Sequence, residues 1–348
     1  MQLLSFILVK GPMIRFIVSA EHGYTFKALT KGKFAGARLP VEIWSYPRLF
    51  LAKALPPGTW IFCDLERLSV WELRMAGEIA RLLRESGESF HVHNDPARAA
   101  CRYELLHRLH QAGFNRFRAF RAEDGMPHAR FPVFLRLESD HNLPLTGLIE
   151  TSDALHQALM NLESQGVSRR GLLIIEYETE PLAPGVFRKY AAYRFGSQIV
   201  ADHMVHDVTW LAKHGAVEAW SPERYAQEAK YVRDNPHEKD LMRAFEIGAI
   251  EYGRADYGIV GGAPQIWEIN TNPSLPEGDP EKCPPDRVVA TLLSKKNRLS
   301  AIVALDSSNS GPWVRLQSEV LDRYRNWQVR WPGLPGGRWR RKFVVRRP

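Results

Sequence analysis

The sequence predicts an α/β protein with α+β character in its second half. In the first 120 residues, short apolar strand-like runs alternate with segments of helical apolar spacing, which is typical of a parallel sheet covered by helices. Further along, strand pairs meet at Gly-containing turns, which indicates antiparallel hairpins. The chain has 348 residues, of which 45% are hydrophobic and 25% charged, and this is enough for two or three domains.

Residues 1–120 are predicted to form an N-terminal parallel α/β domain. The predicted strands are Ile14–Ser19, Trp60–Asp64 and Phe90–His93, and the predicted helices are Ser69–Ser86 and Ala97–Ala112. Ser69 is expected to cap the first helix and Gly87 to end it. The alternation of strands with helices implies parallel strands, because each helix carries the chain back to the start of the next strand.

The second half is predicted to contain strands and hairpins with helices between them. Strand signals cover Phe131–Leu137 and Gly171–Tyr177, and a hairpin over Phe187–His203 turns at Gly196 and Ser197. Helical spacing and capping residues predict the following segments: Ser152–Gln165, Trp210–Ala219, Ser221–Asn235, His237–Tyr252, Arg287–Leu305 and Val314–Trp327.

The hairpin over residues 249–276 carries the most specific chemistry in the sequence. Its arms meet at a Gly-Gly turn, and Glu268 and Asn270, two residues apart, point to the same face of the second arm. Asp256 on the first arm can pair across to join them. Two carboxylates and an amide oxygen are hard ligands of the kind that Mg²⁺ takes together with phosphate oxygens. Arg254 lies two residues before Asp256, so it faces the same side and can clamp a phosphoryl group.

This hairpin resembles the metal-binding signature of the ATP-grasp superfamily. Arg254-x-Asp256 is followed, twelve residues after the aspartate, by Glu268 of Glu-Ile-Asn-Thr-Asn-Pro. The pattern is similar to that of D-alanine–D-alanine ligases, with glutathione synthetase and ribosomal-protein glutamate ligases as relatives. The resemblance implies that Asp256, Glu268 and Asn270 bind Mg²⁺, with Mn²⁺ as an alternative, and that Arg254 stabilises phosphoryl oxygens. It also implies an ATP-grasp fold, in which two small α+β subdomains at residues 121–200 and 201–305 enclose ATP.

The resemblance also indicates residues that bind the nucleotide. Arg136 stands where this superfamily usually has a lysine that reaches the phosphates, and arginine is acceptable there because it is always charged. The end of the following strand, Glu176 with Tyr177, Glu178 and Thr179, resembles the hinge that contacts adenine. Residues 138–150 replace the Gly-rich loop that family members often place over the phosphates.

Four further residues are candidates for the substrate or the transferred group. Lys189 and Arg188 lie where related enzymes place a basic residue on the phosphates or the acyl phosphate; the alternative is an exposed basic face of a sheet. His141 is either a substrate residue or an ordinary loop histidine, and His203 is a candidate for substrate binding or for a base. Elsewhere, the arginines of the second helix, Arg98, Arg102 and Arg108, are expected to form a solvated face.

The basic charge of the chain is concentrated at its C-terminal end. From Arg323 to Pro348 there are nine of the 47 Lys and Arg residues and no acidic residue, so residues 1–322 carry 38 basic and 39 acidic side chains and a net charge of −1. Residues 306–348 are therefore expected to form a helix and a basic tail outside the catalytic body. The three cysteines are far apart, which argues against a disulfide framework or a zinc site and favours a cytoplasmic protein.

The function that follows is an ATP- and Mg²⁺-dependent ligase. The resemblance implies that a small-molecule or peptide carboxylate is activated as an acyl phosphate, which an amine or thiol acceptor then attacks. Two alternatives stay open: a kinase of the same fold acting on a hydroxyl, and a non-catalytic nucleotide-binding protein with a basic interaction tail. No membrane partner is expected, and nucleic acid is expected only through the tail.

Overall fold

The computed structural model describes residues 14–30, 39, 41–212, 215–275, 283–305 and 310–330. These residues form two compact units, one of the residues up to Ala97 together with those from Leu305 onward, and one from Arg98 to Ala304. From the sequence, the first boundary was expected at residue 120 instead. The last part of the predicted basic tail, residues 331–348, lies outside the described residues. Among the described helices, none is long and apolar enough to cross a membrane.

The first unit is built on a four-stranded sheet in the order β2-β1-β4-β5. All three strand pairings are parallel, which confirms the α/β prediction for this part of the chain. The bounds of the four strands are β1 Ile14–Val18, β2 Val41–Ser45, β4 Gly58–Phe62 and β5 Phe90–His93. A short antiparallel pair joins β3, Ala54–Leu55, to β13, Val314–Arg315. The α-helices of this unit are α1 Lys27–Thr30, α2 Tyr46–Leu51, α3 Val70–Glu85 and α9 Glu319–Arg330.

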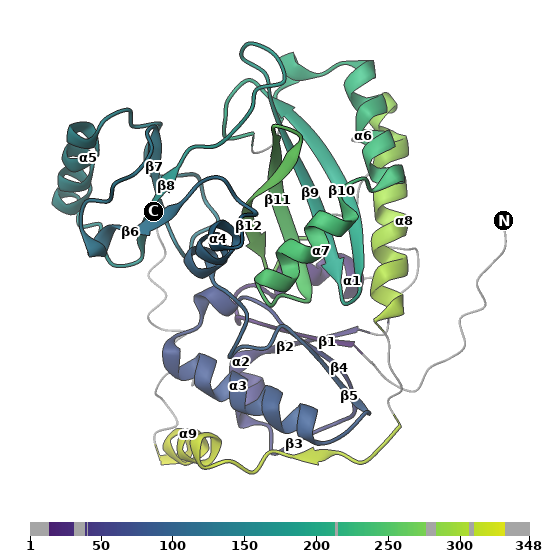
Figure 1. Cartoon of the computed structure of the whole chain (residues 1–348). Helices are drawn as coiled ribbons and strands as arrows, with labels where there is room; N and C mark the ends of the chain where they lie inside the picture. The colour runs from purple at the N-terminus through teal and green to yellow at the C-terminus, as the bar shows by residue number, and fades with distance from the viewer. Residues whose placement is uncertain are drawn as a thin grey trace, which may run out of the picture. The chain divides into compact units, whose positions relative to one another are not determined.

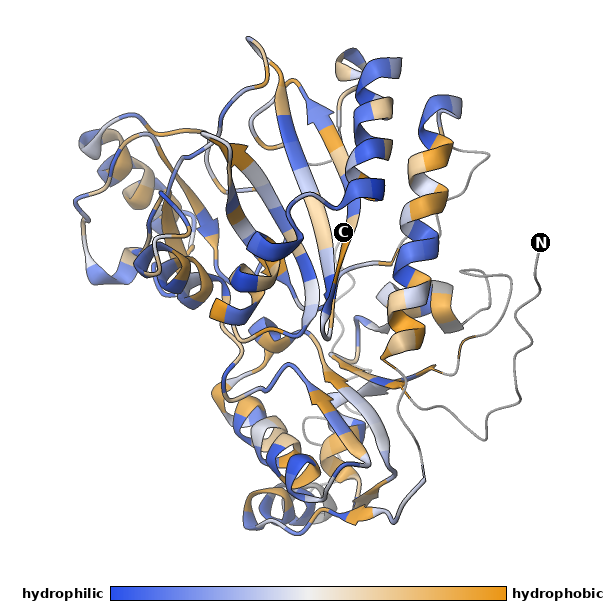
Figure 2. Ribbon diagram, turned by 45° about the vertical axis from the view of Figure 1, so that its right-hand side comes forward, coloured by the Kyte–Doolittle hydropathy of each residue, from blue (hydrophilic) through white to orange (hydrophobic). Residues whose placement is uncertain are grey.

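Helix α3 shows how local sequence signals set an element of this unit. Ser69 accepts a hydrogen bond from the backbone of Glu72, whose side chain bonds back to Ser69, so the predicted cap is a complete capping box. The buried side chains, Met75, Ala76, Ile79, Ala80 and Leu83, recur at helical spacing along one face. Figure 2 shows the resulting mixture of hydrophobic and hydrophilic residues along the helix.

The second unit contains two antiparallel sheets (Figure 1). The larger has the order β10-β9-β11-β12, and the smaller has the order β6-β8-β7. The strands of the larger sheet are β9 Phe187–Phe195, β10 Gln198–Asp207, β11 Tyr252–Val260 and β12 Ala263–Asn270. The strands of the smaller sheet are β6 Ala119–Arg121, β7 Val133–Leu137 and β8 Leu172–Glu176. Both predicted hairpins, with turns at Gly196 and at Gly261–Gly262, are confirmed.

Helices pack against both sheets in the second unit. These helices are α4 Arg102–Gln111, α5 Ser152–Ser164, α6 Pro222–Asp234, α7 Glu238–Ile247 and α8 Val288–Ala304. Apolar side chains of α4, α6 and α7 form one core with one face of the larger sheet. Leucines of α5 form another core with one face of the smaller sheet. Leu106 of α4 also packs against Leu173 and Ile175 on the other face of the smaller sheet, which leaves only part of that face for a cavity.

Four helix predictions differ from the structure. The helix expected from Ala97 begins only at Arg102, because the Ala97 N–H bonds to the Asp95 carboxylate and residues 97–101 link the two units. The helix expected over Trp210–Ala219 is wrong: positive φ angles at Ala212 and Gly215 break it, and a 3₁₀ turn over Val217–Ala219 is what forms.

The other two differences lie at helix ends. The helix predicted to run to Tyr252 ends at Ile247, since Ala249 has a φ of 51° and Tyr252 already belongs to β11. The helix predicted over Val314–Trp327 begins at Glu319, because Val314 and Arg315 pair with β3. A smaller error concerns α5, which is capped by Thr151 and not by Ser152.

Candidate active site

The two sheets border a cavity of about 440 Å³ within the second unit, each with the face opposite to the cores described above. Alternation along β7 explains the lining on one side: Val133 and Leu135 enter the core under α5, and Phe134 and Arg136 face the cavity. Eleven of the predicted site residues line it besides Arg136: His141, Glu176, Tyr177, Glu178, Thr179, Lys189, His203, Arg254, Asp256, Glu268 and Asn270. Only Arg188, among the predicted residues, is not part of this lining.

Arg188 lies on the other face of β9. Its guanidinium sits over the ring of Tyr190, 5.0 Å from the ring centroid, and Tyr190 belongs to the core beneath α6 and α7. Strand alternation therefore separates Arg188 from Lys189. The structure does not bring Arg188 to the predicted phosphate site. Lys189 is buried and faces the cavity, so the alternative of an exposed basic face does not hold for it.

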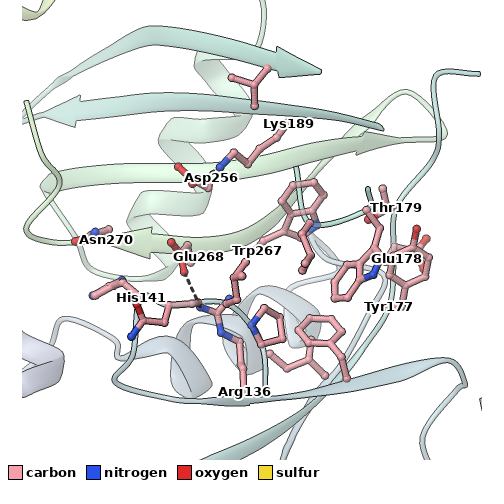
Figure 3. A pocket seen from close by; sticks show the side chains of 18 of the residues that line it. Arg136, His141, Tyr177, Glu178, Thr179, Lys189, Asp256, Trp267, Glu268 and Asn270 are labelled. Carbon is pink, nitrogen blue, oxygen red and sulfur yellow. Dashed lines mark hydrogen bonds and ion pairs between the residues drawn. The ribbon is translucent and has the colours of Figure 1, made fainter. Parts of the chain in front are cut away.

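A row of residues crosses the larger sheet at the charged end of the cavity. Asp256 on β11 pairs with Glu268 on β12 and, on its other side, with Ala191 on β9, which in turn pairs with His203 on β10. Residues opposite each other in neighbouring strands share a face. The register thus brings Asp256 and Glu268 side by side, as the sequence predicted. Figure 3 shows Asp256, Glu268 and Asn270 on adjacent strands, with Lys189 reaching Asp256.

Asp256 is held between two cations. Its carboxylate accepts hydrogen bonds from Lys189 Nζ at 3.1 Å and from Arg254 Nε at 2.9 Å. Burial alone would raise the pKa of Asp256, but the charges of Arg254 and Lys189 outweigh it and hold the pKa well below its usual value. The carboxylate is therefore ionised at neutral pH, as a metal ligand must be.

Glu268 is held between two further arginines. Its Oε2 accepts hydrogen bonds from Arg102 and, at 3.4 Å, from Arg136. Burial would raise the pKa of Glu268, and the charges of Arg102 and Arg136 lower it below the usual value. Burial and the neighbouring Arg102 lower the pKa of Arg136 to about 10, which leaves Arg136 protonated at neutral pH. The charged end is thus a network of alternating carboxylates and cations.

The prediction that Arg102 lies on a solvated face is wrong. The side chain is 7% exposed, and its NH1 group donates to the backbone carbonyls of Leu137, Glu138 and Asp140. Arg102 therefore ties the start of the 138–150 loop to Glu268. Arg98, by contrast, is exposed as expected. From sequence, the two arginines looked alike because the start of α4 was misplaced by five residues.

The carboxylate pair and Asn270 fit a divalent metal ion. Asn270 Oδ1 accepts the N–H of Asn272 at 2.7 Å, which leaves its second lone pair for another partner. Among the described residues, no three His, Cys, Asp or Glu side chains gather closely enough to hold a metal alone. Two ionised carboxylates with an amide oxygen suit Mg²⁺, which completes its octahedron with water and phosphate oxygens.

The hinge end of the cavity is aromatic. Trp210 packs against Phe134, with ring centroids 5.0 Å apart, and against Tyr177 in an edge contact at 5.6 Å. Trp210 therefore lies beside the predicted adenine hinge. Ile175 and Trp267 add further apolar lining. A flat ligand ring fits such surroundings by stacking.

The Glu176 carboxylate is occupied by the protein itself. It accepts hydrogen bonds from the backbone N–H groups of Arg118 and Arg130 at 2.9 and 2.7 Å, and from the Arg118 guanidinium at 2.7 and 3.0 Å. Burial would raise the pKa of Glu176, but these hydrogen bonds and the Arg118 charge lower it. The side chain anchors the strand end, which leaves the backbone groups after Glu176 for the purine contact that the sequence predicted.

Two β-bulges bring Trp267 and His203 to the cavity, from which strand alternation would have turned both away. Asp256 pairs with Glu268 but Tyr257 with Ile266, so Trp267 is the extra residue of β12. A Cβ on Gly258 would lie 2.6 Å from the Trp267 ring, so glycine makes room for this side chain. On β10 the register shifts between Ala201 and His203, and Asp202 is the extra residue. Neither Trp267 nor Asp202 was predicted as a site residue, because bulges have no reliable sequence signal.

Comparisons with known proteins concern the fold. No family model matches the sequence, and no curated protein matches it. Among solved structures, the chain is similar to D-alanine–D-alanine ligase from Bacillus anthracis in complex with ATP, with 12% identity and a TM-score of 0.43 over 84% of this chain and 98% of that chain. It is similar to a RimK domain ATP-grasp protein from Sphaerobacter thermophilus, with 16% identity and a TM-score of 0.44 over 81% and 98%.

A third similar structure is the ATP-grasp ligase PsnB in complex with a phosphomimetic variant of its minimal precursor, Mg and ADP. The identity is 13% and the TM-score 0.45, over 85% of this chain and all of that chain. Because the TM-scores lie below 0.5 and the identities are low, the residues of the cavity carry the functional argument.

Proposed function

We propose that this chain is an ATP- and Mg²⁺-dependent ligase of the ATP-grasp type, which activates a carboxylate as an acyl phosphate for attack by an amine or thiol. The carrying observation is the polarity of the cavity. One end is aromatic, around Phe134, Tyr177 and Trp210, and the other is the carboxylate–cation network around Asp256 and Glu268. A nucleoside triphosphate has the same polarity, with a flat base at one end and charged phosphates at the other.

The net charge of the network supports this assignment. Two carboxylates, Asp256 and Glu268, are paired with four cations, Lys189, Arg254, Arg102 and Arg136, so the six groups together carry +2. This charge balances the −2 of ATP with one bound Mg²⁺. The other charged lining residues with partners, such as Arg287 with Glu228, form neutral pairs. A buried set of charges with a net excess indicates a ligand of the opposite sign.

Different residues of the network would bind the metal ion and the phosphates. Asp256, Glu268 and Asn270 would hold Mg²⁺, which supplies charge neutralisation to phosphate oxygens. Lys189 and Arg254 donate hydrogen bonds to Asp256 in this structure. With ATP bound, they would donate to the oxygens of the transferring phosphoryl group. Arg136 faces the same space from β7. The purine would lie against Trp210 and Tyr177, in contact with the backbone after Glu176.

A kinase acting on a hydroxyl is the second candidate, because the same residues would serve it. The paired Asp202 and His203 beside the charged row could accept a proton from a hydroxyl as well as from an amine. The two functions differ in product: a ligase releases ADP and inorganic phosphate, and a kinase releases ADP without free phosphate. Product analysis therefore separates them even while the natural substrate is unidentified.

The first test is calorimetric titration of the full chain with Mg-ATP. The wild type is expected to bind, and Glu268→Gln is expected to bind at least tenfold more weakly, by about 1.4 kcal/mol, because a metal ligand is lost. Glu163→Gln, an exposed glutamate on α5, is the matched control and should bind as the wild type does. Thermal melts of both variants check that the fold is intact. Absence of binding by the wild type would contradict the ligase and the kinase alike.

The second test identifies the reaction. The protein is incubated with Mg-ATP, hydroxylamine and a panel of amino acids and short peptides, and ADP, phosphate and hydroxamate are measured. Hydroxylamine traps an acyl phosphate as a hydroxamate whatever the natural acceptor is. Hydroxamate with equal amounts of ADP and phosphate supports the ligase. ADP with a phosphorylated product and no phosphate supports the kinase.

A further inference from the structure

The bulge in β10 sets a carboxylate–imidazole pair at the edge of the cavity. Asp202 is the extra residue of the bulge, and His203 Nδ1 lies 2.7 Å from Asp202 Oδ2. The His203 side chain lines the cavity and is 25% exposed, and that of Asp202 is 3% exposed. Adjacent residues of a regular strand point to opposite faces, so this contact exists because the bulge re-aims one of them.

Two side chains of helix α8 contact the buried Asp202 carboxylate. Ser294 Oγ donates to Asp202 Oδ1 at 2.6 Å, and Arg298 Nε lies 3.3 Å from the same oxygen. Burial would raise the pKa of Asp202, but Arg298, His203 and Ser294 lower it far below its usual value. Asp202 is therefore a fixed anion. A buried ion cluster of this kind costs free energy that a packed apolar contact would not, which points to a role other than stability.

The ionised Asp202 sets the tautomer of His203. A carboxylate can only accept hydrogen bonds, so Nδ1 of the neutral imidazole carries the hydrogen that Asp202 accepts. The lone pair then belongs to Nε2, the ring nitrogen remote from Asp202. A buried carboxylate that orients an imidazole in this way presents Nε2 to a substrate as a proton acceptor.

The row of paired residues across the sheet places His203 away from the predicted metal ligand Asp256. His203 is separated from Asp256 by the β9 residue Ala191, that is, by two strand spacings or about 10 Å. Charged groups of the cavity that face this space are Asp256 and Arg254 on β11, Lys189 on β9 and Arg287 before α8. A substrate carbonyl bound between His203 and the Asp256–Lys189 pair would have phosphate on one side and imidazole on the other.

We infer that the Asp202–His203 pair is the proton acceptor for the nucleophile that attacks the acyl phosphate. The inference rests on the proposed ligase function and names the residue that serves its second step. The amine lone pair forms the new C–N bond, and the C–O bond to phosphate breaks with its electron pair on the leaving phosphate. The proton lost by the nitrogen passes to His203 Nε2, and from the imidazolium to phosphate or solvent. His203 touches the nucleophile; Asp202, Ser294 and Arg298 position it.

The experiment compares two nucleophiles on His203→Ala and His203→Gln. It uses the carboxylate that gives hydroxamate in the panel and the amino acid that gives the fastest amide formation. Amide formation should fall at least 100-fold, the effect of losing a general base. Hydroxamate formation should fall less than about threefold, because hydroxylamine is largely unprotonated and a strong nucleophile at neutral pH. Glutamine can keep a hydrogen bond to Asp202 but cannot accept the proton, so a purely structural role would be rescued by it.

The pH dependence of amide formation tests the role of His203 independently of how much activity its variants lose. In the wild type, the rate of amide formation should fall at low pH, because protonated His203 accepts no proton. This acid limb of the pH profile should be absent in both His203 variants. Histidine nitrogen NMR on the wild type without substrate should show Nδ1 protonated and Nε2 free at neutral pH.

The control and the outcomes separate this inference from the function on which it rests. His156→Ala, an exposed histidine on α5, should change neither reaction, and Mg-ATP affinity should stay within threefold in every variant. Equal loss of amide and hydroxamate, an unchanged acid limb in His203→Gln, or an Nε2-protonated tautomer would each overturn the role of His203. Failure of the wild type to form any hydroxamate would overturn the ligase function itself.

Discussion

The two sheets that border the cavity use different parts of the polypeptide. The larger sheet presents side-chain charges: Asp256, Glu268, Lys189 and Arg254 come from three neighbouring strands and are fixed by strand register. The smaller sheet contributes one charge, Arg136, to this network. Its hinge end presents aromatic surface and backbone, and the Glu176 carboxylate there is occupied by Arg118 and Arg130. The charged wall of the cavity, formed mainly by the larger sheet, is suited to binding charged groups of a ligand. The hinge wall, formed by the end of the smaller sheet, is suited to holding a flat ring.

This difference decides what each wall tolerates. A side chain in a charged network cannot change without leaving a buried partner unpaired, which costs several kcal/mol. A backbone contact makes no demand on the side chain that carries it. The charged wall should therefore respond strongly to single substitutions and the hinge wall weakly, except where an aromatic ring is removed. Three substitutions, ordered by expected effect, test this contrast.

The largest effect is expected for Arg102→Met. Methionine keeps much of the apolar volume but leaves Glu268 with Arg136 alone and three loop carbonyls without their donor. The free energy of unfolding at pH 7, measured by chemical denaturation, should fall by about 3 kcal/mol, and Mg-ATP affinity should fall with it. Arg98→Met, in the exposed residues before the same helix, is the control and should change neither. A loss below about 0.5 kcal/mol would mean that Arg102 is the solvated residue the sequence suggested.

The pH dependence of that loss follows from the lowered pKa of Glu268. A carboxyl group whose folded pKa is depressed contributes stability above its unfolded pKa, about 4.3, and loses it as the pH falls through the folded value. The stability difference between wild type and Arg102→Met should accordingly be constant near neutral pH and shrink below about pH 4. A difference independent of pH would indicate packing and not charge.

The sequence was informative where function depends on side-chain type and spacing. Asp256, Glu268 and Asn270 could be placed together because strand periodicity and a Gly-Gly turn fix their geometry within one hairpin. The sequence was uninformative where contacts between residues far apart in the chain determine the position of a side chain. Arg102 reaches Glu268 across 166 positions of the chain, and no local pattern marks it.

Bulges account for the other omissions. Trp267 and Asp202 are each the extra residue at a register shift, and a strict two-residue period assigns such residues to the wrong face. Arg188 was expected beside Lys189, yet the same period, which is regular in β9, sends it to the opposite face. Glu176 was assigned to adenine from its position alone, and its partners Arg118 and Arg130 lie outside every predicted helix and strand.

A smaller effect, confined to the nucleoside, is expected for Trp210→Ala. Loss of one stacking ring weakens the binding of a base by about 1–3 kcal/mol, or roughly five- to 150-fold. Calorimetry should show this loss for Mg-ATP and little change for magnesium tripolyphosphate, which has the charges without the base. Trp220→Ala, at an exposed tryptophan outside the cavity, should leave both unchanged. Equal weakening of both ligands would place Trp210 in the support of the charged wall.

The smallest effect on nucleotide binding is expected for Glu176→Gln. Its carboxylate already accepts from two backbone N–H groups and the Arg118 guanidinium, so the purine is left to the backbone beyond it. Mg-ATP affinity should change less than threefold, or about 0.7 kcal/mol, and the preference for ATP over GTP should stay as in the wild type. The free energy of unfolding should fall more than the free energy of Mg-ATP binding, because the buried Glu176 side chain accepts four hydrogen bonds that an amide cannot all accept. A tenfold loss of ATP binding with unchanged tripolyphosphate binding would instead put this carboxylate on the purine, and both walls of the cavity would then recognise their ligand through side chains.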